Sequence, residues 1–143
     1  MFRVRRMTQG DYGEVLSLLN EHFPHVGATV EKLTDRLARG AHFFVAESGG
    51  RVIGFVDLQM GRSAFVRGLA VAKRWRGKGV GTALLERAIA HARKEGKRFI
   101  YIKVRTSNEK AIRVYQKKGF VIIREKLGVT GEPLFVMRKG LEA

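Results

Sequence analysis

The most informative segment of the chain is Arg76-Gly77-Lys78-Gly79-Val80-Gly81-Thr82. A strand pattern precedes it and a helical pattern follows, so the segment opens a helix. The first N–H groups of a helix lack intrahelical acceptors and lie at the positive end of its dipole, where anions are stabilised. The glycines leave the backbone accessible, and Arg76 and Lys78 add positive charge. The segment therefore predicts a site for a phosphate-bearing ligand.

Two common nucleotide-binding motifs do not fit this segment. A Walker A loop requires Gly-Lys followed by Ser or Thr, whereas Gly77-Lys78 is followed by Gly79. The dinucleotide fingerprint would place a glycine at position 82, which is Thr82. A glycine turn that merely lets a helix and a strand pack closely is the alternative reading of an isolated run. The segment alone indicates an anion site without naming its ligand.

The rest of the chain alternates between strand and helix patterns. Helices are expected after Thr8, which can cap the first, and over residues 29–40, 79–96 and 108–118. Strands are expected over residues 2–6, 42–48, 51–60, 64–71, 99–104, 120–124 and 134–138, with a tight hairpin at Gly49-Gly50. This order predicts a mixed α/β domain: a mostly antiparallel sheet of six to seven strands flanked by about four helices.

Composition sets further limits. The chain has 143 residues, 45% of them hydrophobic, and no linker pattern, so we expect a single domain over residues 1–143. The absence of cysteine excludes disulfides, thiolate metal sites and cysteine nucleophiles. No apolar run approaches the roughly 20 residues of a membrane helix, and residues 1–6 lack the apolar stretch of a secretory signal. We therefore expect a cytoplasmic protein without a membrane partner.

The formal net charge of +15 points to an anionic partner. Between positions 73 and 118 the sequence has fifteen Lys and Arg residues but only three acidic residues. A phosphate-rich cofactor and a nucleic acid both fit this excess, as does a solvated basic surface. Aromatic residues are not interleaved with the basic ones, and no nucleic-acid-binding signature is present, so nucleic acid is the less favoured partner.

The segment with its flanks resembles the GNAT superfamily of N-acetyltransferases. The cofactor loop of that family reads Arg or Gln, two residues, Gly, one residue, then Gly or Ala; Arg76, Gly79 and Gly81 match it. The family's neighbouring patterns are matched by Leu69-Ala70-Val71 upstream and by Asn108, Ala111, Tyr115 and Gly119-Phe120 downstream. The resemblance covers about half of the chain closely, and the order of the elements fits the rest.

This resemblance implies an acetyl-CoA-dependent N-acetyltransferase that moves the acetyl group to a primary amine by direct attack in a ternary complex. The implied cofactor-binding residues are Leu69, Ala70, Val71, Arg76, Gly77, Lys78, Gly79, Val80, Gly81, Thr82 and Asn108. The strand residues would pair with the pantetheine arm, the loop amides would hold the pyrophosphate, and Asn108 would contact the arm near the thiol. Tyr115 would protonate the departing thiolate. The alternatives are a helix-capping role for Asn108 and a core position for Tyr115.

Proton transfer from a tyrosine to a thiolate is uphill by about 1.5 pKa units, or roughly 2 kcal/mol. Neighbouring cations would stabilise the phenolate and reduce this cost. The candidates are Lys103, Arg105, Lys117 and Lys118.

Residues 104–108 and Tyr115 most resemble the RimI-like enzymes, which acetylate protein N-termini. Those enzymes place a glutamate base where this chain has Lys103, and the aromatic pair that grips the peptide is not visible in residues 125–128. A lysine here predicts an acceptor that also bears a carboxylate or phosphate. Water relayed to Asp57 or Glu47 is the alternative route for the amine proton.

Other possibilities remain beside the enzyme. A catalytically silent acyl-CoA sensor would share the same loop, and a nucleic-acid-binding protein would use the basic surface. His22 and His25 are expected in a surface loop because Pro24 breaks their helical spacing, and His42 and His91 show no catalytic partner. We expect no metal. The acceptor would be a small-molecule or peptide amine, and the family often forms homodimers.

Overall fold

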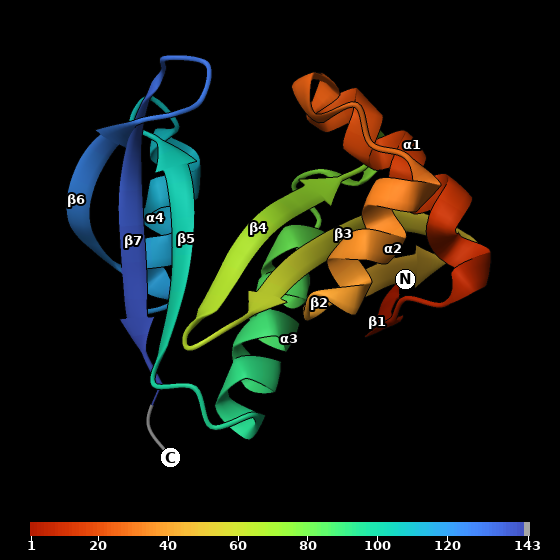
Figure 1. Ribbon diagram of the computed structural model, residues 1–143, viewed down its shortest axis with the longest axis horizontal. Helices are drawn as coiled ribbons and strands as arrows, with labels where there is room; N and C mark the ends of the chain where they lie inside the picture. Colours follow the sequence, from red (N-terminus) through yellow and green to blue (C-terminus); the bar gives the residue numbers. More distant parts are fainter. Residues whose placement is uncertain (142–143) are drawn as a thin grey trace.

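The computed structural model describes residues 1–141 and is organised around one seven-stranded sheet (Figure 1). The strand order is β1-β2-β3-β4-β5-β7-β6. The strands are β1 (Arg3–Arg6), β2 (Ala41–Ser48), β3 (Arg51–Met60), β4 (Ala64–Val71), β5 (Phe99–Arg105), β6 (Val121–Leu127) and β7 (Pro133–Gly140). Every neighbouring pair is antiparallel except β4 and β5. The expected mostly antiparallel mixed fold is confirmed.

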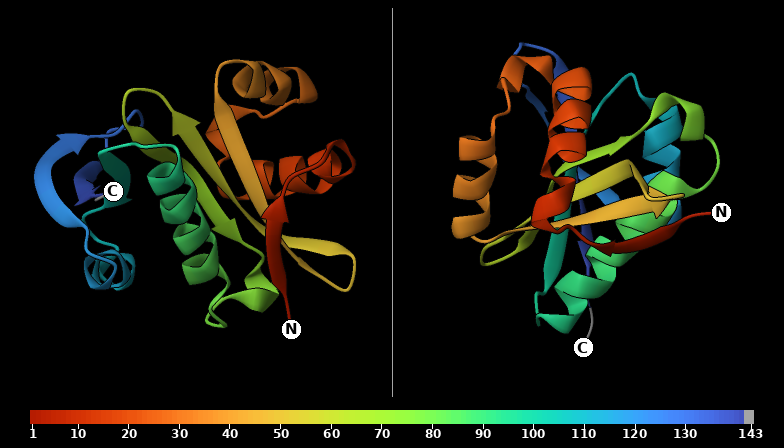
Figure 2. Two further views of the ribbon diagram at one scale, coloured as in Figure 1. Left: turned by 90° about the horizontal axis from the view of Figure 1, so that it is seen from below. Right: turned by 90° about the vertical axis from the view of Figure 1, so that its right-hand side faces the viewer.

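Four α-helices cover the two faces of the sheet in the described part of the chain. They are α1 (Tyr12–His22), α2 (Val30–Ala38), α3 (Val80–Lys94) and α4 (Glu109–Lys117). Figure 2 shows α1 and α2 on one face and α3 on the other. The packing agrees, because Val15 and Leu33 belong to one apolar cluster and Leu84 belongs to the other, which α4 residues also join. None of the described helices is both long and apolar enough to span a bilayer.

Helix boundaries follow the local chemistry that predicted them. Thr29 caps α2 by accepting the Lys32 N–H at 3.2 Å, and Gly96, which follows α3, has a φ of 76° that favours glycine. The first helix differs from the prediction. Thr8 precedes a short 3-10 turn, Gln9–Asp11, and α1 begins only at Tyr12. The Asp11 carboxylate accepts the Thr8 N–H at 2.7 Å, which forms the capping box of that turn.

The sheet splits between β4 and β5. Their parallel pairing consists of three residue pairs, from Ala64 with Ile100 to Val66 with Ile102, and the strands then separate (Figure 1). On its other side, β4 stays paired with β3 as far as Val71, with a bulge at Arg67. Backbone groups of residues 67–71 that face β5 therefore have no strand partner. This split opens the sheet beside the turn at residues 76–82.

Candidate functional site

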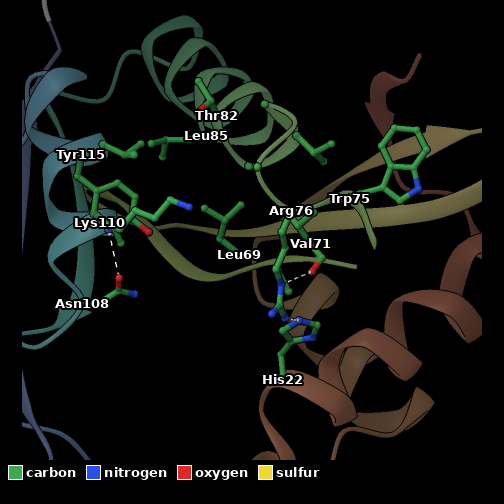
Figure 3. Close-up of a pocket in the computed structure, with 17 residues that line it drawn as sticks. His22, Leu69, Val71, Trp75, Arg76, Thr82, Leu85, Asn108, Lys110 and Tyr115 are labelled. Carbon is green, nitrogen blue, oxygen red and sulfur yellow. Dashed lines mark hydrogen bonds between the residues drawn. The ribbon is translucent and has the colours of Figure 1, made fainter. Parts of the chain in front are cut away.

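A cavity of about 410 Å³ lies where the sheet splits, and Figure 3 shows its walls. One wall is the free half of β4, the second is the turn at the start of α3, and the third is α4. Among the residues predicted from the sequence, the structure brings these to the cavity: Leu69, Ala70, Val71, Arg76, Gly77, Gly79, Val80, Gly81, Thr82, Asn108 and Tyr115. Sequence segments up to forty-six positions apart thus share one site, as expected from the three motifs.

The turn presents bare backbone to this cavity. Gly77 and Gly79 have φ angles of 75° and 85°, and a Cβ at either position would meet nothing within 4 Å. The first backbone bond of α3 runs from the Ala83 N–H to the Gly79 oxygen at 3.0 Å. The N–H groups of residues 80–82 consequently have no intrahelical acceptor. Open space, free amides and the helix dipole together fit a pyrophosphate such as that of coenzyme A.

Of the two cationic side chains of the turn, only that of Arg76 lines the cavity. The Arg76 Nη2 lies 2.8 Å from His22 Nε2, and its Nε lies 3.4 Å from the Val71 oxygen (Figure 3). Lys78 is not among the residues that line the cavity; its Nζ lies 5.9 Å from the centre of the Trp75 ring. The expectation that both side chains charge the cavity mouth is therefore corrected for Lys78.

Sequence reasoning misplaced His22 and overlooked several wall residues. His22 is the last residue of α1, half-buried on the cavity wall, and not a surface-loop residue. The overlooked residues are Trp75, Leu85, Lys110 and Val114, and they line the cavity together with Ala111, which the family pattern had named. Residues 110–114 surround Tyr115 at helical spacing, which is a signal that could have identified them. No sequence signal places His22 at the cavity, because only the fold brings the end of α1 to this wall.

Asn108 is the N-cap of α4. Its Oδ1 accepts the Ala111 N–H at 3.2 Å (Figure 3), so the capping alternative describes this oxygen. Because capping uses only the oxygen, the Nδ2 group of the same amide is still a donor at the cavity wall. One side chain can therefore cap the helix and donate to a ligand.

Tyr115 lies in α4 between the cavity and the core. Its ring packs against Phe120 with 6.1 Å between centroids, and it joins the apolar cluster under α3. Burial raises the pKa of Tyr115. The expectation that cations would ease its ionisation is wrong: the shift has burial as its cause, and Lys118 is instead paired with Glu86. The phenol thus stays protonated at neutral pH and is available as a donor.

A smaller cavity adjoins the first and leads to another, and Arg67, Lys103 and Arg105 line both of these smaller cavities. One is also lined by Leu69, Asn108 and Tyr115, which it shares with the main cavity. The other extends to Lys126 on β6 and to Glu132. The pKa of Lys103 is lowered by partial burial and by the nearby positive charges of Lys126, Arg67 and Arg124.

The two carboxylates considered as bases differ in their surroundings. Asp57 is 3% exposed and accepts from Arg36 at 2.6 and 2.9 Å; burial raises its pKa. It lines a further cavity with Arg67 and Gly68, close to the bulge of β4. Glu47 accepts from Arg5 at 2.8 Å on the β1 side of the sheet, and this hydrogen bond lowers its pKa. Asp57 is the better placed of the two.

Within residues 1–141, no three or more His, Asp or Glu side chains gather as a group that could hold a metal ion. The rings of His42 and His91 pack against each other with centroids 4.8 Å apart and a tilt of 47°. Both are remote from the motifs at the cavity and are absent from its lining.

Comparison with known proteins assigns the family. The family model for the acetyltransferase (GNAT) family matches residues 12–120, which include the turn, Asn108 and Tyr115. The chain belongs to the GNAT acetyltransferase family. This confirms the expectation of a GNAT N-acetyltransferase drawn from the cofactor-loop pattern. Among GNAT relatives, an N-alpha-acetyltransferase of Sulfurisphaera tokodaii is 31% identical over 95% of this chain and 91% of that protein.

Other comparisons differ in how much they cover. An uncharacterized N-acetyltransferase of Methanocaldococcus jannaschii is 35% identical over 54% of this chain, and the match spans 38% of that relative's length. The Escherichia coli ribosomal-protein-S18-alanine N-acetyltransferase has the same GNAT fold, with a TM-score of 0.86 at 21% identity over 100% of this chain and 96% of that one. The structure of a GNAT acetyltransferase from Elizabethkingia anophelis with acetyl-CoA bound matches this chain with a TM-score of 0.75 at 19% identity, over 98% of both chains.

Proposed function

We propose that the protein transfers the acetyl group of acetyl-CoA to a primary amine by direct attack while both substrates are bound. The observation that carries this proposal is that the bare turn, the unpaired half of β4 and Tyr115 line one cavity. Acetyl-CoA supplies the activated thioester. The chain supplies binding, orientation and a proton donor, as one domain over residues 1–143.

The cofactor assignments follow from the groups on each wall. Leu69 and Val71, whose backbone groups face away from β3, offer strand-like hydrogen bonds to an extended amide-bearing arm, and Ala70 lies between them on the cavity wall. The amides of residues 77–82 hold the pyrophosphate, with Arg76 at the side. The Nδ2 group of Asn108 donates to the arm nearer the reacting end. Thr82 and Val80 position the first turn of α3 in this arrangement.

Tyr115 is proposed as the proton donor. When the amine nitrogen forms its bond to the acetyl carbon and the carbon–sulfur bond breaks, the phenol gives its proton to the leaving sulfur. The acceptor ammonium loses one proton before attack, and the attacking nitrogen loses a second after its bond to the acetyl carbon forms. One of these protons restores Tyr115 through solvent and the other is released, so the protons balance. The raised pKa keeps the donor protonated until this step.

The proposed acceptor route is the cavity beside Lys103, because it adjoins Tyr115 and lies opposite the cofactor turn. The amine that enters this cavity belongs to a small molecule or to a peptide N-terminus. Asp57, through water, is the proposed proton acceptor for the amine, since it lines the neighbouring cavity beside Gly68.

The test combines binding and turnover on the same preparation. Acetyl-CoA is expected to raise the thermal midpoint of unfolding. Release of free coenzyme A thiol with a panel of primary amines is expected for at least one amine, above hydrolysis without an amine. Stabilisation without thiol release from any amine would indicate the sensor. Salt-sensitive binding of nucleic acid without any response to acetyl-CoA would refute the enzyme.

A further inference from the structure

Four cationic side chains from three strands converge beside Tyr115. Arg67 lies on β4, Lys103 and Arg105 on β5, and Lys126 on β6. All four line one cavity, and three of them line the cavity that reaches Tyr115. We call these four residues the cation cluster. We propose that the acceptor carries a carboxylate or phosphate in addition to its primary amine, and that the cation cluster binds this anionic group.

This proposal rests on the proposed acetyl transfer and names the substrate class that it uses. Its first support is the continuity of the cavities. The space lined by Arg67, Lys103 and Arg105 is also lined by Leu69 and Tyr115, which belong to the cofactor cavity. An acceptor can therefore place its amine near Tyr115 and its anionic group among the cations.

The second support is that the protein neutralises the charges of the cation cluster only in part. Two partly buried cations elsewhere do have partners: Arg5 pairs with Asp11 at 2.7 Å and Arg36 with Asp57 at 2.6 Å. In the part of the chain that the structure describes, no member of the cation cluster forms a salt bridge. Glu132 lines the same cavity, and its carboxylate, which accepts from Thr130, is near enough to Arg105 for that positive charge to lower its pKa. Four positive charges beside one carboxylate leave an excess of like charge, which is unfavourable, and an anionic ligand would relieve this repulsion.

The third support comes from the chemistry of the amine. An acceptor ammonium must lose a proton before attack, and surrounding positive charge favours its neutral form. The same charge would repel a purely cationic acceptor such as a polyamine. An attached carboxylate or phosphate reverses that repulsion, because charge-assisted hydrogen bonds to Arg and Lys attract it. The cation cluster thus favours amines that are zwitterionic or anionic overall.

The experiment compares matched acceptors by kcat/KM from thiol release. The pairs are tyrosine with tyramine, and phosphoethanolamine with ethanolamine. A third pair consists of two short peptides that differ only in Asp or Lys at the second position. We expect the anionic member to be preferred by about tenfold or more, which matches one charge-assisted hydrogen bond. The pair with the largest ratio distinguishes a small-molecule source of the anion from an acidic peptide.

Variants test the assigned residues. Lys103→Gln with Arg105→Gln is expected to raise KM about tenfold for the acceptor that bears a carboxylate or phosphate, and to lower KM for the cationic acceptor of the same pair. Lys94→Gln, on the exposed surface of α3, is the matched control. It should leave the kcat/KM ratio within each acceptor pair unchanged. Adding salt should weaken the preference in the native chain.

Each result has a separate meaning. Equal kcat/KM within every pair, or a preference for the cationic member, would overturn the anion proposal while acetyl transfer stands. A preference that survives intact in the double variant would also overturn it. Absence of thiol release with every acceptor would instead contradict the proposed function.

Discussion

The Arg76 guanidinium and the His22 imidazole lie 2.8 Å apart, Nη2 to Nε2, and join the end of α1 to the turn before α3. A guanidinium only donates, so Nε2 is the acceptor. The ring proton is then on Nδ1, which donates to the Leu18 oxygen at 3.0 Å. His22 therefore orients Arg76 from outside the turn.

Removing either partner should weaken the same connection. His22→Ala and Arg76→Ala are each expected to lower the free energy of unfolding, and their double variant by less than the sum, with a coupling of about 1 kcal/mol. Denaturant unfolding of the four proteins measures this. Arg74→Ala, exposed in the same segment, is the control. Strict additivity would show that the contact contributes nothing.

The glycines of the turn should respond differently to a methyl group. Gly79→Ala forces a left-handed residue at a φ of 85°, so we expect about 1 kcal/mol of lost stability and weaker acetyl-CoA binding. Gly81→Ala lies inside α3, and its Cβ would make an ordinary 3.6 Å contact with Val71. That variant should keep both stability and affinity. Calorimetric titration with acetyl-CoA separates the two, and equal losses would contradict the proposed cradle.

Asn108 offers a way to separate folding from binding. Asn108→Asp retains an oxygen that accepts the Ala111 N–H but removes the Nδ2 donor, whereas Asn108→Ala removes both. The alanine variant should lose about 1 kcal/mol of stability, and the aspartate variant should lose almost none. Both should bind acetyl-CoA more weakly. If the aspartate variant binds as well as the native protein, Asn108 serves only as a helix cap.

Tyr115→Phe should keep the ring packing against Phe120 and lose the proton donor. We expect kcat to fall on the order of 10²-fold, with KM for acetyl-CoA little changed. Pre-steady-state thiol release is the appropriate measurement because it reports the bond-breaking step. Val114→Ala, which trims another wall residue, controls for altered cavity shape. An unchanged rate across pH in Tyr115→Phe would remove the proposed role.

Asp11 predicts how stability depends on pH. Hydrogen bonds from Arg5 at 2.7 and 3.0 Å lower its pKa from 3.8 to about 2. Because the carboxyl pKa is lower in the folded than in the unfolded state, ionised Asp11 stabilises the fold fully at pH values above 3.8. This contribution is lost as the pH falls from 3.8 through 2. Asp11→Asn should therefore cost about 2 kcal/mol at pH 7 and almost nothing once the pH is well below the folded pKa of about 2. Unfolding curves over this range check it; a pH-independent difference would contradict it.

Local signals predicted most of the fold. The strand at residues 64–71 was predicted with its observed bounds, because its apolar pattern ends sharply at both sides. Thr29 predicted the start of α2, and Gly96 the end of α3, since capping and left-handed backbone depend on neighbouring residues alone. The start of α1 was missed because Thr8 and Asp11 form a turn of their own first.

Long-range arrangement accounts for what the sequence could not provide. The wall from Leu69 to Tyr115 was predicted through motifs, but the direction of the Lys78 side chain and the place of His22 depend on packing between distant elements. Similarly, Lys103 was recognised as unusual in one position of a family pattern. Its meeting with Arg67 and Lys126 depends on how β4, β5 and β6 are placed in space.

The parallel pairing of β4 with β5 has a consequence for engineering the turn. Two neighbouring parallel strands cannot be joined by a hairpin. The chain must return from the end of β4 to the level at which β5 begins, through a crossover connection. Residues 76–82 belong to that return route: they follow a short turn at Lys73–Trp75 and include the first residues of α3. Shortening them would therefore alter the strand connection as well as the anion cradle. Single substitutions that keep the route intact are the way to separate ligand affinity from topology.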